Sequence, residues 1–152
     1  MNYLELKIPP VIVTLIFGIL IFCTNNIIPL ERFNFSNIVS VASFLIGCLI
    51  SVLGGIEFRK KSTTVNPTKP DTSSKLVTSG IYQFTRNPMY LGFLLCLLSE
   101  VIYFNNFIFG FFHIICFILY LNLFQIIPEE RILTQIFGNE YTRYMNSSRR
   151  WI

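Results

Sequence analysis

Long runs without charged residues restrict this chain more than any other feature. Positions 8–30, 33–56 and 101–128 hold 23, 24 and 28 residues with no Asp, Glu, Lys or Arg. A helix needs about 20 mostly apolar residues to cross the hydrocarbon core of a membrane. Only 13% of the 152 residues are charged, whereas about 25% are charged in an average soluble domain. The runs therefore predict an integral membrane protein.

The stretch that follows Arg86 predicts one more span. It holds 13 uncharged residues, 87–99, and reaches spanning length if Glu100 lies inside the helix or near its far end. An acid within a membrane helix is costly and is a functional candidate, but near a helix end its side chain can reach the headgroups. Both roles stay open for Glu100. We expect His113, the one weakly ionisable residue of the run 101–128, to be a packing residue.

The expected fold is all-α, a polytopic membrane protein with four transmembrane helices and short amphipathic C-terminal helices. The spans are expected at about 9–29, 37–57, 89–106 and 107–127. A polar loop at 58–88 connects the second and third spans, and a tail at 128–152 follows the fourth. A chain of 152 residues is one domain's worth of polypeptide, so a single domain is expected.

The positions of the basic residues predict the orientation of the spans. Six of the 12 Lys and Arg residues lie in the loop 58–88 and four lie in the tail. Because basic residues are enriched on the cytoplasmic side, both segments and both termini of this multi-pass protein are expected there. The net charge of +4 then suits the lipid bilayer. No basic stripe is interleaved with stacking aromatics outside the apolar spans, so no nucleic-acid partner is expected.

Small residues form a stripe on the second span. Their spacings of 3, 4, 4 and 3 place all five on one helical face, and they are Ser40, Ser43, Gly47, Ser51 and Gly54. Such a stripe lets the backbone of a second helix approach closely. The partner helix is expected either in the same chain or in a second copy, which makes a homo-oligomer one of the alternatives. The four cysteines are widely spaced within apolar runs, so neither disulfides nor a metal site is expected.

Two polar segments flank the third and fourth spans. Asn87 and Pro88 are typical of a helix start, with Asn at the N-cap and Pro in the first turn. The positive end of that helix dipole would suit a carboxylate, although the pair also serves simply to start a membrane helix. In the tail, the acids Glu129 and Glu130 are expected either to bind a cationic ligand or to favour a helix N-terminus. Gly138 is expected to end the first tail helix, before a short second helix.

Three motifs carry a resemblance to a known family. They are TTVNP at 63–67, GIYQFTRNPMYLG at 80–92 and EERILTQIFGNEYTRY at 129–144. Together they resemble the isoprenylcysteine carboxyl methyltransferase family and, more broadly, the phospholipid N-methyltransferases grouped with it. The resemblance covers about 58–152. It implies a membrane enzyme in which the helices and the cytoplasmic tail enclose S-adenosylmethionine without a Rossmann domain.

The resemblance also implies roles for residues of this chain. Glu129 and Glu130 would form the polar end of the cofactor pocket, and Arg86 would pair with the cofactor carboxylate or with an acidic acceptor. Arg86 and Glu130 are the candidate catalytic residues, and no metal is implied. The remaining cofactor contacts implied are Leu76, Val77, Gly80, Asn87, Pro88, Tyr90, Leu91 and Gly92.

One position departs from the family pattern. Asn87 stands where the best-known members have His, and an amide cannot take up a proton at neutral pH. A carboxylate acceptor needs no base, whereas an amine or a thiol usually must lose a proton. Asn87 therefore cannot be the base, and Glu130 becomes the next candidate.

The sequence thus predicts a methyltransferase that acts on a hydrophobic or lipid-like acceptor at the cytoplasmic membrane face. A second enzyme hypothesis is an NADPH-dependent membrane reductase of the sterol-reductase type, which shares similar tail motifs but uses extra helices. A third hypothesis is a small membrane scaffold without enzymatic activity. The identity of the acceptor stays open among a prenylated cysteine, a phospholipid amine, a fatty acid and a small hydrophobic metabolite.

Overall fold

A computed structural model of the chain describes residues 5–27, 37–61, 70, 75–105 and 107–152. The motif at 63–67 lies outside these residues. The regular structure within them is helical, apart from one isolated β-bridge between Thr85 and Arg149. The elements are α1 (Pro10–Ile27), α2 (Asn37–Lys61), the 3₁₀ turn η2 (Gly80–Gln83), α3 (Pro88–Phe104), α4 (Phe107–Leu121), the π-helical turn η3 (Asn122–Ile126), α5 (Ile127–Phe137) and α6 (Asn139–Ser147).

Two helices are long and apolar enough to cross a membrane. One is α2, and the other is the unbroken helix of 31 residues formed by α4, η3 and α5, Phe107–Phe137. Few of their residues are buried, and Ile38 and Ile108 are 77% and 73% exposed. The apolar helices α1 and α3 have 18 and 17 residues. At a rise of 1.5 Å per residue they measure about 27 and 26 Å, slightly less than a hydrocarbon core of about 30 Å.

The helix boundaries follow the predicted spans with two differences. The second helix continues past position 57 to Lys61, and its last turn holds Arg59, Lys60 and Lys61. Cations there interact favourably with the negative end of the helix dipole. The helix predicted for 107–127 continues to Phe137, so the first tail helix extends from it without a turn. Positions 28 and 29, predicted to be helical, lie outside the described residues.

Pro128 explains how this long helix passes from the apolar span into the tail. Proline has no N–H, so the carbonyl of Phe124 loses its usual helical donor four residues on. The Leu6 backbone N–H donates to that carbonyl instead, at 2.9 Å. The preceding turn widens, with the Ile127 N–H donating to the carbonyl of Asn122 five residues back. The N-terminal segment, residues 5–9, therefore docks on the helix where proline has freed a backbone acceptor.

The stripe of small residues on α2 packs against α3 of the same chain. The hydroxyls of Ser40 and Ser43 donate to the carbonyls of Ser99 and Leu95, at 2.8 and 3.1 Å. A Cβ added to Gly47 would lie 2.6 Å from the Gly92 carbonyl oxygen, so no larger residue fits without a shift. The predicted packing role of the stripe is confirmed, and its helix partner lies within the chain.

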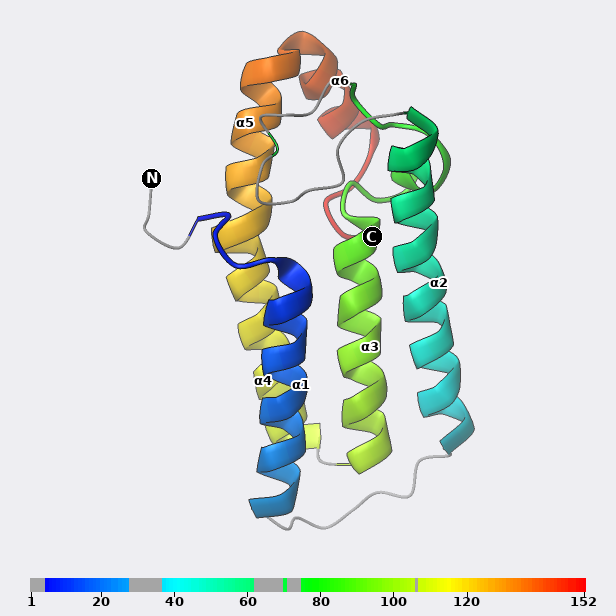
Figure 1. Cartoon of the computed structure of the whole chain (residues 1–152), viewed down its shortest axis with the longest axis vertical. Helices are drawn as coiled ribbons and strands as arrows, with labels where there is room; N and C mark the ends of the chain where they lie inside the picture. Colours follow the sequence, from blue (N-terminus) through cyan, green and yellow to red (C-terminus); the bar gives the residue numbers. More distant parts are fainter. Residues whose placement is uncertain (1–4, 28–36, 62–69, 71–74, 106) are drawn as a thin grey trace.

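The helix arrangement gathers the polar segments at one end of the bundle. Figure 1 shows the end of α2, the start of α3, and α5 and α6 at that end. At the opposite end, Asn105 adopts φ +56 as the C-cap residue of α3, which ends at Phe104, two residues before the end of the predicted span. The motifs at 80–92 and 129–144 therefore meet at one end of the bundle.

Candidate functional site

The Arg86–Pro88 corner and the two tail glutamates are in direct contact. The Arg86 Nη2 donates to the Glu130 Oε1 at 3.2 Å, and Tyr90 donates its hydroxyl to the Glu129 Oε1 at 2.5 Å. Both acids lie within the continuous helix Phe107–Phe137, in the turn around Pro128, so they do not occupy a free helix N-terminus. The predicted juxtaposition of these motifs is thus present.

A second arginine completes the polar cluster around Glu130. The Arg150 Nε and Nη2 donate to the two carboxylate oxygens of Glu130 at 3.2 and 2.6 Å. The side chains of Arg86 and Glu130 are 11% and 13% exposed, whereas that of Arg150 is 40% exposed. Guanidinium groups therefore donate to both carboxylate oxygens of Glu130. The Glu129 carboxylate instead accepts a hydrogen bond from the Tyr90 hydroxyl.

Arg86 also caps the C-terminus of α6. Its Nη1 donates to the carbonyl of Met145 at 2.9 Å and to the carbonyl of Ser148, the C-cap residue. The last carbonyls of a helix have no intrahelical donors, and a cation there also interacts with the helix dipole. The sequence predicted a ligand-facing role for Arg86, and the structure adds this helix-capping role. Within the described part of the chain, its buried Nε has no hydrogen-bond partner.

The C-terminal segment, residues 148–152, lies alongside the start of α3. The Arg86 N–H donates to the Arg149 carbonyl at 2.8 Å. Asn87 occupies the predicted N-cap position, but its side chain does not cap the helix. Its Nδ2 donates to the Arg150 carbonyl at 2.8 Å instead. Trp151 then anchors the segment, because its Nε1 donates to the Asn122 Oδ1 at 3.3 Å.

A tyrosine cluster forms beside the charged groups. Val77, Tyr82, Tyr141 and Tyr144 are buried together, and Leu76 packs against them. The Tyr144 hydroxyl donates to the Tyr82 carbonyl at 2.7 Å. Burial raises the pKa of Tyr144 to about 12. Burial also raises the pKa of Tyr141, where the nearby Glu130 adds to the shift and Arg86 opposes it.

Glu57, which the sequence reasoning did not single out, underlies the Gly80 turn. Gly80 has φ +59, and a Cβ there would lie 2.7 Å from the Glu57 Cδ. The Glu57 Oε2 accepts a hydrogen bond from the Ser79 hydroxyl at 2.8 Å, while its Oε1 pairs with Lys60 at 2.7 Å. Glycine is thus needed here for both its backbone conformation and its lack of a side chain. The sequence signal that could have pointed to Glu57 is the presence of an acid at the polar end of a predicted membrane helix.

The remaining predicted cofactor contacts have different neighbours. Pro88 is buried in the first turn of α3, and Leu91 is partly buried. Gly92 faces α2, because a Cβ there would meet the Ser51 hydroxyl and the Gly47 carbonyl oxygen at 2.1 and 2.4 Å. The structure therefore gives Gly92 a packing role on the side of α3 that contacts α2.

The histidine and the cysteines of the described residues show no arrangement suited to a metal site or a disulfide. No group of three or more His, Cys, Asp or Glu side chains suited to a metal ion occurs among them. The His113 Nδ1 lies 2.6 Å from the Phe109 carbonyl oxygen of its own helix. All four cysteines are free thiols.

Comparisons with known proteins agree with this arrangement. A family model described as phospholipid methyltransferase matches residues 35–140. An uncharacterized protein of Haemophilus influenzae is 44% identical over 64 residues, which are 42% of this chain and the whole length of that protein. No solved structure is significantly similar to this chain.

Proposed function

Because this chain belongs to the phospholipid methyltransferase family, we propose that it transfers a methyl group from S-adenosylmethionine to a hydrophobic or lipid-like acceptor. The proposed site lies where the start of α3 meets the first turn of α5, at the cytoplasmic membrane face. The observation that carries the proposal is the contact of Tyr90 with Glu129 beside that of Arg86 with Glu130. Membership of this family favours a transferase over the reductase and scaffold hypotheses.

The residues at this position fit the charges of the proposed cofactor. Glu129 is a partly buried acid that is suited to bind an ammonium group. The first backbone N–H groups of α3 and the guanidinium of Arg86, with its unpartnered Nε, suit a carboxylate. The rings of Tyr82 and Tyr141 offer an aromatic wall for the adenine or the cationic sulfur. Leu76 and Val77 would extend this wall.

The chain's own residues would act mainly by positioning. When bound, S-adenosylmethionine supplies an electrophilic methyl group on a positively charged sulfur. Arg86 and Arg150 hold Glu130 in place, which leaves Glu129 as the acid better placed to accept a proton. An amine or thiol acceptor would release one proton during the transfer, whereas a carboxylate acceptor would release none. The C-terminal segment would help to exclude water from the site.

We propose that α1 and α3 also span the membrane, which gives four spans with both termini in the cytoplasm. The basic residues Arg59, Lys60 and Lys61 lie at the same end of the bundle as the C-terminal helices. Short helices of this kind are accommodated by thinning of the bilayer or by flanking residues that reach the interface. The exposed apolar side chains of these helices support a location in the lipid bilayer, where a hydrophobic acceptor could approach the site laterally.

Ligand-dependent thermal stability tests the proposed cofactor. The purified protein in detergent is expected to be stabilised by S-adenosylmethionine and by its demethylated product, but not by NADPH. Glu129→Gln is expected to weaken this stabilisation at least fivefold in ligand concentration, because it removes the charge that pairs with the ammonium group. Glu140→Gln is the matched control, since Glu140 is an exposed acid on α6.

Methyl transfer itself requires a separate assay. Lipid extracts incubated with the protein and a labelled methyl donor are expected to contain a labelled apolar product, detected by mass spectrometry. Stabilisation by NADPH alone would support the reductase, and stabilisation by neither ligand would support the scaffold. Unchanged binding in both Glu129→Gln and Glu130→Gln would remove the two glutamates from the site.

A further inference from the structure

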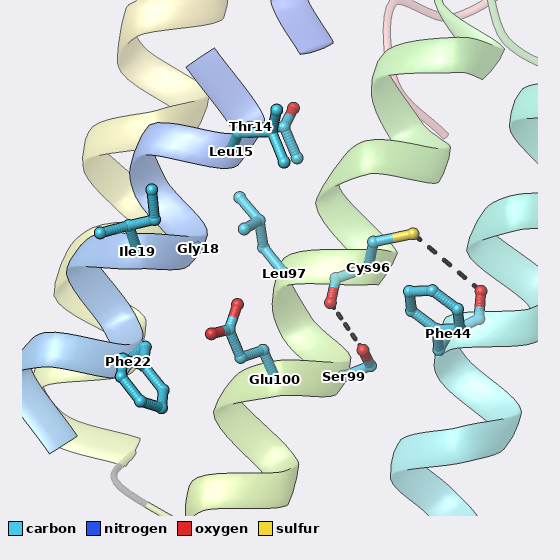
Figure 2. Close-up of a pocket in the computed structure, with 10 residues that line it drawn as sticks. All are labelled: Thr14, Leu15, Gly18, Ile19, Phe22, Phe44, Cys96, Leu97, Ser99 and Glu100. Carbon is cyan, nitrogen blue, oxygen red and sulfur yellow. Dashed lines mark hydrogen bonds between the residues drawn. The ribbon is translucent and has the colours of Figure 1, made fainter. Parts of the chain in front are cut away.

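A groove lies between α1, α2 and α3, away from the proposed methyl-transfer site. This groove has a volume of about 480 Å³ and is mostly apolar. Figure 2 shows its walls, with Thr14 and Gly18 on α1, Phe44 on α2, and Leu97 and Glu100 on α3. Pockets of about 300–1,000 Å³ are typical of small-molecule sites. The groove is therefore large enough for an aliphatic chain.

Glu100 is the polar group of the groove that most needs a partner. The other hydroxyls along it are satisfied within their own helices, since Thr14 donates to the Pro10 carbonyl at 2.8 Å and Ser99 to the Cys96 carbonyl at 2.6 Å. No hydrogen bond or ion pair reaches the Glu100 carboxyl from the described part of the chain. A carboxyl group among apolar helices is costly unless a cation or a donor pairs with it.

Gly18 leaves the space that the carboxyl occupies. A Cβ added to Gly18 would lie 3.1 Å from the Glu100 Oε2, so the carboxyl points from α3 toward the backbone of α1, as Figure 2 shows. From Thr14 to Phe22 the groove follows α1 for about 12 Å at a rise of 1.5 Å per residue. Glu100 thus faces the middle of a mostly apolar groove that is about 12 Å long.

We propose that this groove binds a single apolar chain that carries a primary ammonium group, with the ammonium on the Glu100 carboxyl and the chain along the groove. An ammonium supplies both the opposite charge and the hydrogen-bond donors that this carboxyl needs. A fatty acid would bring a second carboxyl next to Glu100, and an alcohol would supply a donor without the charge. The occupant that we propose is therefore a free alkylamine with one chain. This proposal does not depend on methyl transfer.

Binding of matched amphiphiles to the full-length protein tests the proposal. The protein is placed in nanodiscs of phosphatidylcholine, and dissociation constants are measured for dodecylamine, dodecanol and dodecanoic acid. The amine is expected to bind at least tenfold more tightly than the alcohol.

Two variants and two controls connect the binding to the groove. Glu100→Gln is expected to abolish the preference for the amine over the alcohol, while Gly18→Leu is expected to weaken both at least fivefold by filling the channel. Gly55→Leu is the matched control, because a Cβ at Gly55 meets nothing within 4 Å, and Glu140→Gln controls for loss of an acid. Equal binding of amine and alcohol by the original protein would overturn the proposal. Amine preference that persists in Glu100→Gln, or tighter binding of the fatty acid, would overturn it as well.

Discussion

Replacement of Arg86 by alanine is expected to release the tail from the bundle. Arg86 donates to the carbonyls of Met145 and Ser148 and pairs with Glu130, while its own side chain is 11% exposed. A hydrogen bond to a charged group contributes about 1.5–3 kcal/mol. The variant loses three such contacts, but water can enter and Arg150 still pairs with Glu130. We therefore expect α6 to lose about 3 kcal/mol of local stability, which is less than the sum of the three contacts.

Hydrogen–deuterium exchange measures this loss where it occurs. At about 1.4 kcal/mol per tenfold, Arg86→Ala should speed the exchange of α6 amides about 100-fold. The amide of Ser148, which donates to the Tyr144 carbonyl at 3.1 Å, is a suitable reporter. Amides in the middle of α3 and α4 should exchange as before, because local opening of α6 leaves the apolar bundle folded.

Two arginine variants serve as controls for this prediction. Arg150 also contacts Glu130 but is 40% exposed, so Arg150→Ala should cost only about 0.5–1 kcal/mol, a two- to fivefold change in exchange. Arg143 is exposed and its hydrogen bond stays within α6, so Arg143→Ala should have almost no effect. Equal effects of the Arg86 and Arg150 variants would refute the capping role. Faster exchange throughout the bundle in Arg86→Ala would refute the local character of the loss.

Three further predictions follow from the packing. Gly92→Ala should destabilise the protein by about 1–3 kcal/mol in denaturant unfolding, because its methyl group overlaps α2, whereas Gly55→Ala, in open space, should not. Pro128→Ala should restore an intrahelical N–H that competes with the Leu6 N–H for the same carbonyl, and faster exchange of the Leu6 amide would show it. The buried Tyr144 has its pKa raised to about 12, so the stability that it contributes is complete below pH 10 and should fall between pH 10 and 12. Tyr144→Phe should flatten this decline in thermal unfolding, and an unchanged decline would contradict the assignment.

The candidate site was partly predictable because its motifs carry local signals. An Asn–Pro pair favours a helix start, and Pro88 is indeed the first residue of α3. The two adjacent glutamates are compatible with a helix start as well, but they lie within the continuous helix Phe107–Phe137. The hydrogen bond between Tyr90 and Glu129 joins residues 39 positions apart, and such a contact depends on how helices are placed. Resemblance, rather than periodicity, predicted that these motifs meet. Neither source pointed to the capping of α6 by Arg86, because that contact depends on where the last residues of the chain lie.

Some interpretations needed the structure because one pattern serves two purposes. The small-residue stripe of α2 predicts close helix packing, but the same stripe suits a second copy as well as a neighbouring helix. Packing on α3 decided between them, and it also gave Gly92 a steric role that a motif cannot distinguish from ligand contact. The sequence left the role of Glu100 open. Its side chain can extend to the headgroups or point into a groove, and these two cases differ only in the direction of the side chain.

The sequence by itself indicated a helical membrane protein, because uncharged runs of 23 to 28 residues are long enough to cross the hydrocarbon core as helices. It also determined most helix ends, since proline, asparagine and glycine act on the backbone within a turn. The tertiary structure alone decided which charges are paired and which acid faces a groove. It also decided that the N-terminal segment binds the Phe124 carbonyl, which Pro128 leaves without its usual helical donor. Apart from local pairs such as Glu57–Lys60, these features join residues 20 or more positions apart. Only the packing of whole helices brings such residues close together.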